Sequence, residues 1–205
     1  MIDEPVAARQ TLEHALRWAE SLAHPHSLAY AGTFATYTLI MLGDEAGARR
    51  VLDRGKAVAE AHALLHWAIM LQLLDGFLLA REGQVEHGID VMQCAAQEWA
   101  RRGFKLTVPQ NRAFLAEIFL SVGRLEESFA ALDEGAAISR ETGMAFWDAE
   151  LLRLRGELLA ASGTPAEEVR PLLQQAIDVA TRQGAIVLVR RAERSLEQLL
   201  GHEEN

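Results

Sequence analysis

Histidine pairs are the side chains whose spacing comes nearest to a metal site. His62 and His66 stand four residues apart, a spacing at which two imidazoles on one helix face can share a zinc ion. The pair straddles the junction of two expected helices, so we predict a partly exposed pair at a helix end instead. His24 and His26 flank Pro25, and we interpret them as ordinary loop histidines. The sequence therefore predicts no metal site.

The single cysteine, Cys94, lies one turn after Asp90 in an apolar segment. It has no partner for an internal disulfide, and we expect a buried, inert thiol rather than a nucleophile. The sequence contains no Gly-x-x-x-x-Gly-Lys-Ser/Thr, no His-Glu-x-x-His and no paired Cys-x-x-Cys. We therefore predict a protein that is not an enzyme, with no catalytic residue and no cofactor.

Carboxylates and arginines recur at helical spacing, three and four residues apart, as in Glu150, Arg153 and Glu157. Such pairs support solvated helix faces, which is the interpretation we give them. The tryptophans are expected to fill the core rather than to stack on a ligand. They are Trp18, Trp67, Trp99 and Trp147.

Acidic residues outnumber basic ones among the 205 residues, 29 to 20, for a formal net charge of −9. Proteins that bind nucleic acid or anionic membranes usually present a basic face, so the balance argues against both kinds of partner. No stretch approaches the 18 or more apolar residues of a membrane span, and the first residues do not resemble a signal peptide. We expect a cytoplasmic protein.

Glycines at an unbroken spacing of 40 mark an internal repeat. They are Gly43, Gly83, Gly123 and Gly163. Seven residues before each glycine is a small or modest residue (Thr36, Gly76, Ala116, Gly156), and four before is a large apolar one (Leu39, Leu79, Phe119, Leu159). After the glycines a large apolar residue (Leu52, Met92, Leu132, Leu173) is followed by a small one (Gly55, Ala95, Gly135, Ala176). Small residues let paired helices approach closely, so we expect Gly156→Leu to cost several kcal/mol.

These offsets resemble the tetratricopeptide pattern of helical hairpins, although the period is 40 and the usual tryptophan and closing proline are absent. The resemblance predicts a single all-α domain over 1–205, a right-handed superhelix of antiparallel helix pairs. We expect a half repeat at 4–23, four repeats at 27–63, 64–106, 107–144 and 145–184, and a capping helix at 185–200. The helices are expected at 4–23, 27–42, 44–62, 64–82, 84–102, 107–122, 124–142, 145–162, 165–183 and 185–200.

Ala8, Leu12 and Ala15 stand 40 residues before Ala48, Leu52 and Gly55. The helix at 4–23 therefore corresponds to the second helix of a repeat. We favour the interpretation that the chain is cut from a longer protein over the interpretation that it begins with an unusual half-repeat cap. The alternative leaves Met1 as the native start.

Three segments carry a resemblance to one bacterial group: WDAELLRLRGELL (147–159), LSVGRLEES (120–128) and ALDEG (131–135). They resemble the helical-repeat region that follows an ATPase module in large signalling proteins, whose output is a class III adenylate or guanylate cyclase or a LuxR-type DNA-binding domain. The resemblance extends from about residue 27 to 200. It implies a sensor or docking arm and carries over none of the family's catalytic parts.

The first helix of each tetratricopeptide pair lines a concave groove, so the resemblance implies a partner-binding surface. The expected groove residues are Tyr30, Thr33, Tyr37, Met41, Met70, Phe77, Arg81, Gln110, Glu117, Glu150, Arg153 and Glu157. We predict a protein or peptide partner, for which the ATPase module of the parent protein is a candidate, and a homodimer is a further option. The alternative is a small-molecule sensor, whose sign would be a closed polar pocket with Arg81, Arg153 and Glu150 converging. A purely packed superhelix without a groove is the third possibility.

Overall fold

The computed structural model describes residues 4 to 203, and over these residues the protein is all-helical. Most helix boundaries lie within two residues of the predicted ranges. The helices are α1 (Glu4–Leu22), α2 (Pro25–Met41), α3 (Glu45–Ala61), α4 (Leu65–Arg81), α5 (Val85–Arg101), α6 (Val108–Ser121), α7 (Leu125–Thr142), α8 (Asp148–Ala161), α9 (Ala166–Arg182) and α10 (Ile186–Glu203), with a 3₁₀ turn, η1 (Ala145–Trp147), before α8.

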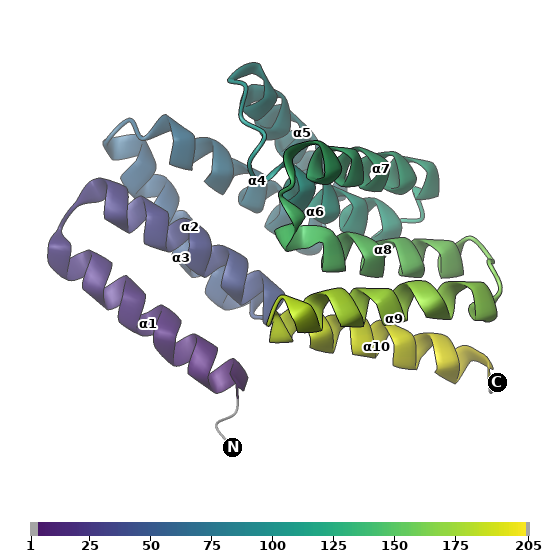
Figure 1. The fold of residues 1–205 in the computed structure, drawn as a ribbon. Helices are drawn as coiled ribbons and strands as arrows, with labels where there is room; N and C mark the ends of the chain where they lie inside the picture. Colours follow the sequence, from purple (N-terminus) through teal and green to yellow (C-terminus); the bar gives the residue numbers. More distant parts are fainter. Residues whose placement is uncertain (1–3, 204–205) are drawn as a thin grey trace. The chain divides into compact units, whose positions relative to one another are not determined.

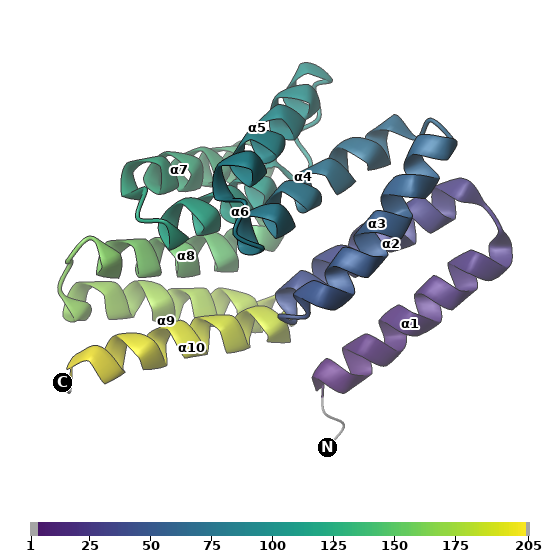
Figure 2. The ribbon, with the colours of Figure 1, turned by 180° about the vertical axis from the view of Figure 1, so that it is seen from behind.

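The helices form two compact units, with the boundary between Trp99 and Ala100 near the end of α5. In the first unit α1 contacts α2, α2 contacts α3, and α3 contacts α4. In the second unit the same neighbour-to-neighbour packing joins α6 to α7, α7 to α8, α8 to α9, and α9 to α10. Figures 1 and 2 show these hairpins from opposite sides. Consecutive pairing of this kind is the packing that the 40-residue period predicted.

The first helices of successive repeats also contact one another, although a second helix separates them in the sequence. These contacts join α2 to α4 in the first unit, and α6 to α8 and α8 to α10 in the second. Each such first helix therefore lies over two neighbours, its own second helix and the next first helix. This arrangement removes most of the surface of α2 and α6 from solvent and explains why these helices are rich in apolar residues on all sides.

The turn glycines adopt the left-handed conformation that their spacing predicted. Gly43, Gly83, Gly123 and Gly163 have φ values of 74°, 95°, 74° and 85°, which L-residues rarely adopt. The other class of turn, after each second helix, repeats at 23, 63, 103, 143 and 184. Glycine occupies the last three of these positions, but alanine occupies the first two, and Ala23 and Ala63 take φ values of 48° and 51°.

Two helix starts differ from their predictions because of proline. Helix α2 begins at Pro25, two residues earlier than expected, since a proline in the first turn needs no N–H partner and the His24 ring accepts the Ser27 backbone N–H at 3.4 Å. Pro165 was expected just inside the next helix, but it precedes α9 with an extended ψ of 140°. Pro171 lies inside α9, a position that the helix tolerates against the usual preference.

The prediction of a buried Cys94 was wrong. Cys94 is exposed on α5, because the inward face of this helix is formed by Met92 and Ala95, which lie two residues before it and one after. The 40-residue repeat could have predicted this, because Cys94 is equivalent to Arg54 and Glu134 in the neighbouring repeats, and both are exposed.

Candidate functional site

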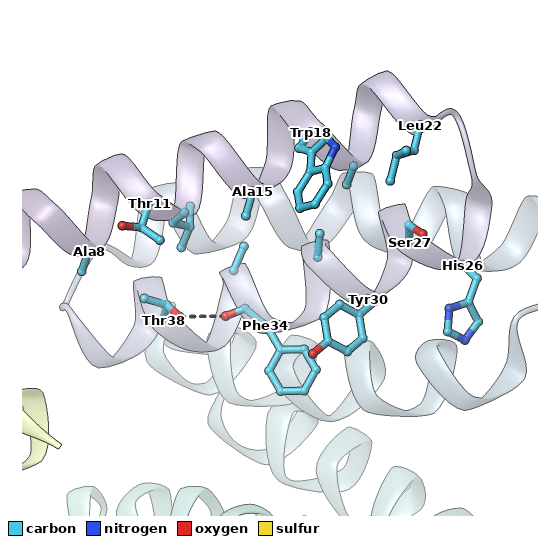
Figure 3. Close-up of a pocket in the computed structure, with 14 residues that line it drawn as sticks. Ala8, Thr11, Ala15, Trp18, Leu22, His26, Ser27, Tyr30, Phe34 and Thr38 are labelled. Carbon is cyan, nitrogen blue, oxygen red and sulfur yellow. Dashed lines mark hydrogen bonds between the residues drawn. The ribbon is translucent and has the colours of Figure 1, made fainter. Parts of the chain in front are cut away.

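An apolar groove lies between α1 and α2 of the first unit. It has a volume of about 650 Å³ and is lined by residues of these two helices alone: Ala8, Thr11, Leu12, Ala15, Trp18, Ala19, Leu22, His26, Ser27, Tyr30, Ala31, Phe34, Ala35 and Thr38. None of them is an aspartate, glutamate, lysine or arginine. Figure 3 shows Trp18 on α1 and the rings of Tyr30 and Phe34 on α2.

Large side chains of this groove face solvent. The exposed fractions of Trp18, Tyr30 and Phe34 are 64%, 51% and 43%, and Leu22 is also exposed. The prediction that Trp18 fills the core was therefore wrong, whereas Trp67 and Trp99 are buried as expected. Trp18 is exposed because it extends from the side of α1 that faces the groove. Exposed aromatic residues gathered in this way mark surfaces that bind partners.

Ring contacts hold the α2 wall of the groove in place. The Tyr30 and Phe34 ring centroids are 4.7 Å apart, and the Tyr30 ring meets the buried indole of Trp67 edge-on at 5.3 Å. The Thr38 hydroxyl donates a hydrogen bond to the Phe34 carbonyl oxygen at 2.9 Å (Figure 3). Because that hydroxyl is satisfied within the helix, the wall presents mainly apolar surface to the groove.

A buried network of charged residues lies in the second unit, among α6, α8 and α10. Arg153 donates to both carboxylate oxygens of Glu150, at 3.0 and 2.7 Å, and to Glu157 at 2.5 Å. Arg191 donates to Glu150 and to Glu117, each at 2.9 Å. The Glu150 and Arg153 side chains are 3% and 6% exposed, so the expectation of a solvated helix face at this place was wrong.

The pKa values of Glu117 and Glu150 are shifted in opposite directions. Burial raises the pKa of Glu117 above its ordinary value, and the nearby Arg191 and Arg153 only partly oppose this. Burial also disfavours ionised Glu150, but the charges of Arg153 and Arg191 outweigh it and lower the pKa of Glu150. Glu117 therefore accepts a proton more readily than Glu150 does.

The twelve residues predicted to line a groove divide by exposure. Tyr30 and Arg81 are exposed, and Met41, Glu117 and Glu157 are half-buried. The other seven are buried: Thr33, Tyr37, Met70, Phe77, Gln110, Glu150 and Arg153. Buried side chains have no free surface to offer a partner in this conformation, and burial raises the pKa of the Tyr37 phenol. Tyr30 is the predicted residue that lies in the α1–α2 groove.

Three residues were expected to converge if the chain sensed a small molecule. Arg153 and Glu150 do lie together, but they bind one another. Arg81 belongs to the first unit, where its Nε donates to Glu45 at 2.8 Å. Trp18, Leu22 and Phe34 were missed as groove residues. The register of α1, which identifies it as a second helix, was the signal that could have found them.

Histidines and acidic side chains are the candidate ligands for a metal centre. Between residues 4 and 203, no group of three or more histidine, cysteine or acidic side chains is placed to hold a metal ion. His62 and His66 lie at the α3–α4 junction, where burial lowers the pKa of His66. No helix in the described part of the chain is both long and apolar enough to cross a membrane.

Comparison with known proteins gives one relative and no family. No family model matches the chain. The chain is similar to Uncharacterized protein R02095 of Rhizobium meliloti (strain 1021), with 25% identity over 193 residues. This alignment covers 94% of the chain and 19% of the relative. The chain therefore spans about a fifth of the length of the protein it matches.

Proposed function

We propose that this chain is a non-catalytic protein-interaction module, cytoplasmic, and a regulatory part of a bacterial signalling protein of the ATPase–cyclase or LuxR type. Its helix pairs coil within each unit as a right-handed superhelix of tetratricopeptide type. The 40-residue repeat and the neighbour-to-neighbour packing support this assignment. The matching region is 19% of the length of the relative, so a region similar to this chain occurs as one part of a much longer protein.

The observation that carries the proposal is the exposed α1–α2 groove. Trp18, Tyr30 and Phe34 together expose apolar surface that costs about 25 cal/mol for each Å² left in water. A partner that covers these rings would recover that free energy, and aromatic residues are the ones most often dominant in binding. The groove contains no ionised carboxylate or guanidinium that would have to be desolvated.

The alternative, a small-molecule effector sensor, has less support. The charged groups that would recognise an effector, Glu150 and Arg153, already neutralise one another in a buried network. An effector would have to break these ion pairs before it could bind them. A reproducible thermal shift of this chain with a nucleotide or a sugar would favour the alternative over an interaction module.

Site-specific photo-crosslinking tests the proposed function. A benzophenone amino acid is introduced at Phe34 in the groove and, as a control of matched exposure, at Val122 in the second unit; these residues are 43% and 41% exposed. Both chains are irradiated in bacterial cells. We expect discrete protein adducts from position 34 that are absent from position 122. Equal adducts from both positions, or none from either, would contradict the proposed function.

A further inference from the structure

Helices α1 and α2 form a pair that consists of a second helix and the first helix of the next repeat. Where a unit contains another pair of this kind, the preceding first helix packs over it. The pair α3–α4 is covered by α2, the pair α7–α8 by α6, and the pair α9–α10 by α8. The α1–α2 pair presents an open groove at the equivalent position.

Residues equivalent to the α1 wall show what such a covering helix contacts. Leu12 corresponds to Met92 and Leu173 in later second helices. A Cβ placed on Gly76 would lie 2.6 Å from the Met92 side chain, and one on Gly156 would lie 2.5 Å from that of Leu173. A small residue of the covering helix therefore meets this position in both units, and the same contact is available at Leu12.

Residues equivalent to the α2 wall face the covering helix as well. Tyr30 and Phe34 correspond to Arg191 and Ser195 in α10, allowing for the one extra residue of the fourth repeat. Arg191 binds Glu150 of the covering helix α8, and Ser195 donates to Glu157 of that helix at 2.6 Å. In α10 these two positions are polar and contact polar residues of α8. In α2 the same positions are aromatic, so a helix that covers them must present apolar residues there.

We propose that the α1–α2 groove binds an amphipathic helix of a partner protein, with an uncharged face that places a small residue against Leu12 and large apolar residues over Tyr30 and Phe34. This inference rests on the proposed interaction function and names the partner's chemistry. Helix-in-groove binding of this kind needs anchors about one turn apart on the incoming helix. The α4 segment has this composition, with Met70, Leu73 and Phe77 near Gly76.

A helix with an uncharged face fits this groove better than a second copy of the chain does, because none of the groove residues is an aspartate, glutamate, lysine or arginine. The helix α10 of a second copy is a first helix by register, but its exposed surface carries Arg190, Glu193, Arg194 and Glu197. Burying these charges against an uncharged groove would be unfavourable.

The probe is a fluorescent peptide of residues 64–82, the α4 segment, with lysines added at both ends for solubility. Fluorescence anisotropy measures its dissociation constant with the full chain. We expect saturable binding that Phe34→Glu weakens at least about tenfold, while Val122→Glu, at an equally exposed residue, leaves it unchanged. Circular dichroism checks that both variants fold. A control peptide with Gly76→Leu is expected to bind at least about tenfold more weakly, since its leucine cannot approach Leu12.

Two results would overturn this inference and leave the proposed function standing. One is equal affinity of the peptide for wild type and Phe34→Glu, with position 34 still crosslinking to a partner in cells. The other is a dimer of the chain alone, detected by light scattering and dissolved by Phe34→Glu, which would make a second copy the occupant. Failure of both the peptide binding and the position-34 crosslink would overturn the proposed function itself.

Discussion

Gly76 of α4 and Gly88 of α5 lie so close that neither position has room for a side chain. A Cβ on Gly76 would lie 2.6 Å from the Gly88 carbonyl oxygen and 2.9 Å from the Met92 backbone nitrogen, and a Cβ on Gly88 would meet the Gly76 carbonyl oxygen. These neighbours are backbone atoms, which cannot rotate away. The pair is therefore a point of very close approach between the two helices and limits how near their axes can lie.

Gly76→Ala should consequently destabilise the chain. Overpacking costs about 1–3 kcal/mol, and alanine contributes about 1 kcal/mol over glycine within a helix, so we expect a net loss of up to about 2 kcal/mol in urea unfolding followed by circular dichroism. Gly201→Ala is the control, since nothing lies within 4 Å of a Cβ there, and it should not lose stability. Gly156→Ala should be milder than Gly76→Ala, because the flexible Leu173 side chain can move. Equal effects at 76 and 201 would contradict this account of the close approach.

Arg153→Met should be among the most damaging single changes in the second unit. It leaves Glu150, 3% exposed, without the two hydrogen bonds that Arg153 donates. Removing one partner of a buried pair costs about 3–5 kcal/mol. Urea unfolding measures the loss. The matched control is Arg17→Met, whose pair with Glu13 is exposed on both sides and should contribute nothing measurable.

A double-mutant cycle separates the pair from its two members. In Arg153→Met with Glu150→Leu, no charge of this pair remains buried, so the double variant should lose clearly less than the sum of the two single losses. Additive losses would mean that Arg153 and Glu150 do not act on one another, and the network would have to be redrawn.

Glu117 and Glu150 should give stability profiles of opposite slope against pH. The raised pKa of Glu117 means that its contribution is present below the ordinary value of 4.5 and is lost as pH rises through the raised pKa. The lowered pKa of Glu150 means that its contribution is present above 4.5 and is lost as pH falls through the lowered pKa. The free energy of unfolding is measured for wild type and for each Glu→Gln variant across these windows.

The wild type should lose its advantage over Glu117→Gln as pH rises above 4.5, and its advantage over Glu150→Gln as pH falls below 4.5. At neutral pH Glu117→Gln should therefore be tolerated far better than Glu150→Gln. The same sign of slope for both variants would show that the two carboxylates are not divided by their surroundings as the structure indicates.

Local features were predictable from the sequence because each depends on a few neighbouring residues. A turn that needs positive φ selects glycine, so Gly43 and its repeats at 40-residue spacing are enough to locate the hairpins. The same is true of the close helix contact at Gly76. Both follow from chain geometry that recurs in every repeat.

Which face of a first helix is covered depends on residues distant in sequence, and here prediction was less successful. Glu150 and Arg153 have the spacing of a solvated pair on one helix, but Arg191, 41 residues after Glu150, helps to bury them. Trp18 has the residue type of a core position, but the groove beside it is open. Spacing within one helix carries no information about the neighbour that packs on it.

Ala63 offers a stabilising substitution, because it occupies the turn position that glycine fills at 103, 143 and 184. Its φ of 51° is left-handed, which costs an L-residue about 1–2 kcal/mol. Glycine removes this strain, but its greater freedom in the unfolded chain costs about 0.4–1 kcal/mol of stability. Ala63→Gly should therefore raise the free energy of unfolding by about 0.5–1 kcal/mol. Ala57→Gly, at an exposed position within α3, should instead lose about 1 kcal/mol. Thermal unfolding compares the two, and a loss of stability in Ala63→Gly would mean that the turn carries no strain for glycine to relieve.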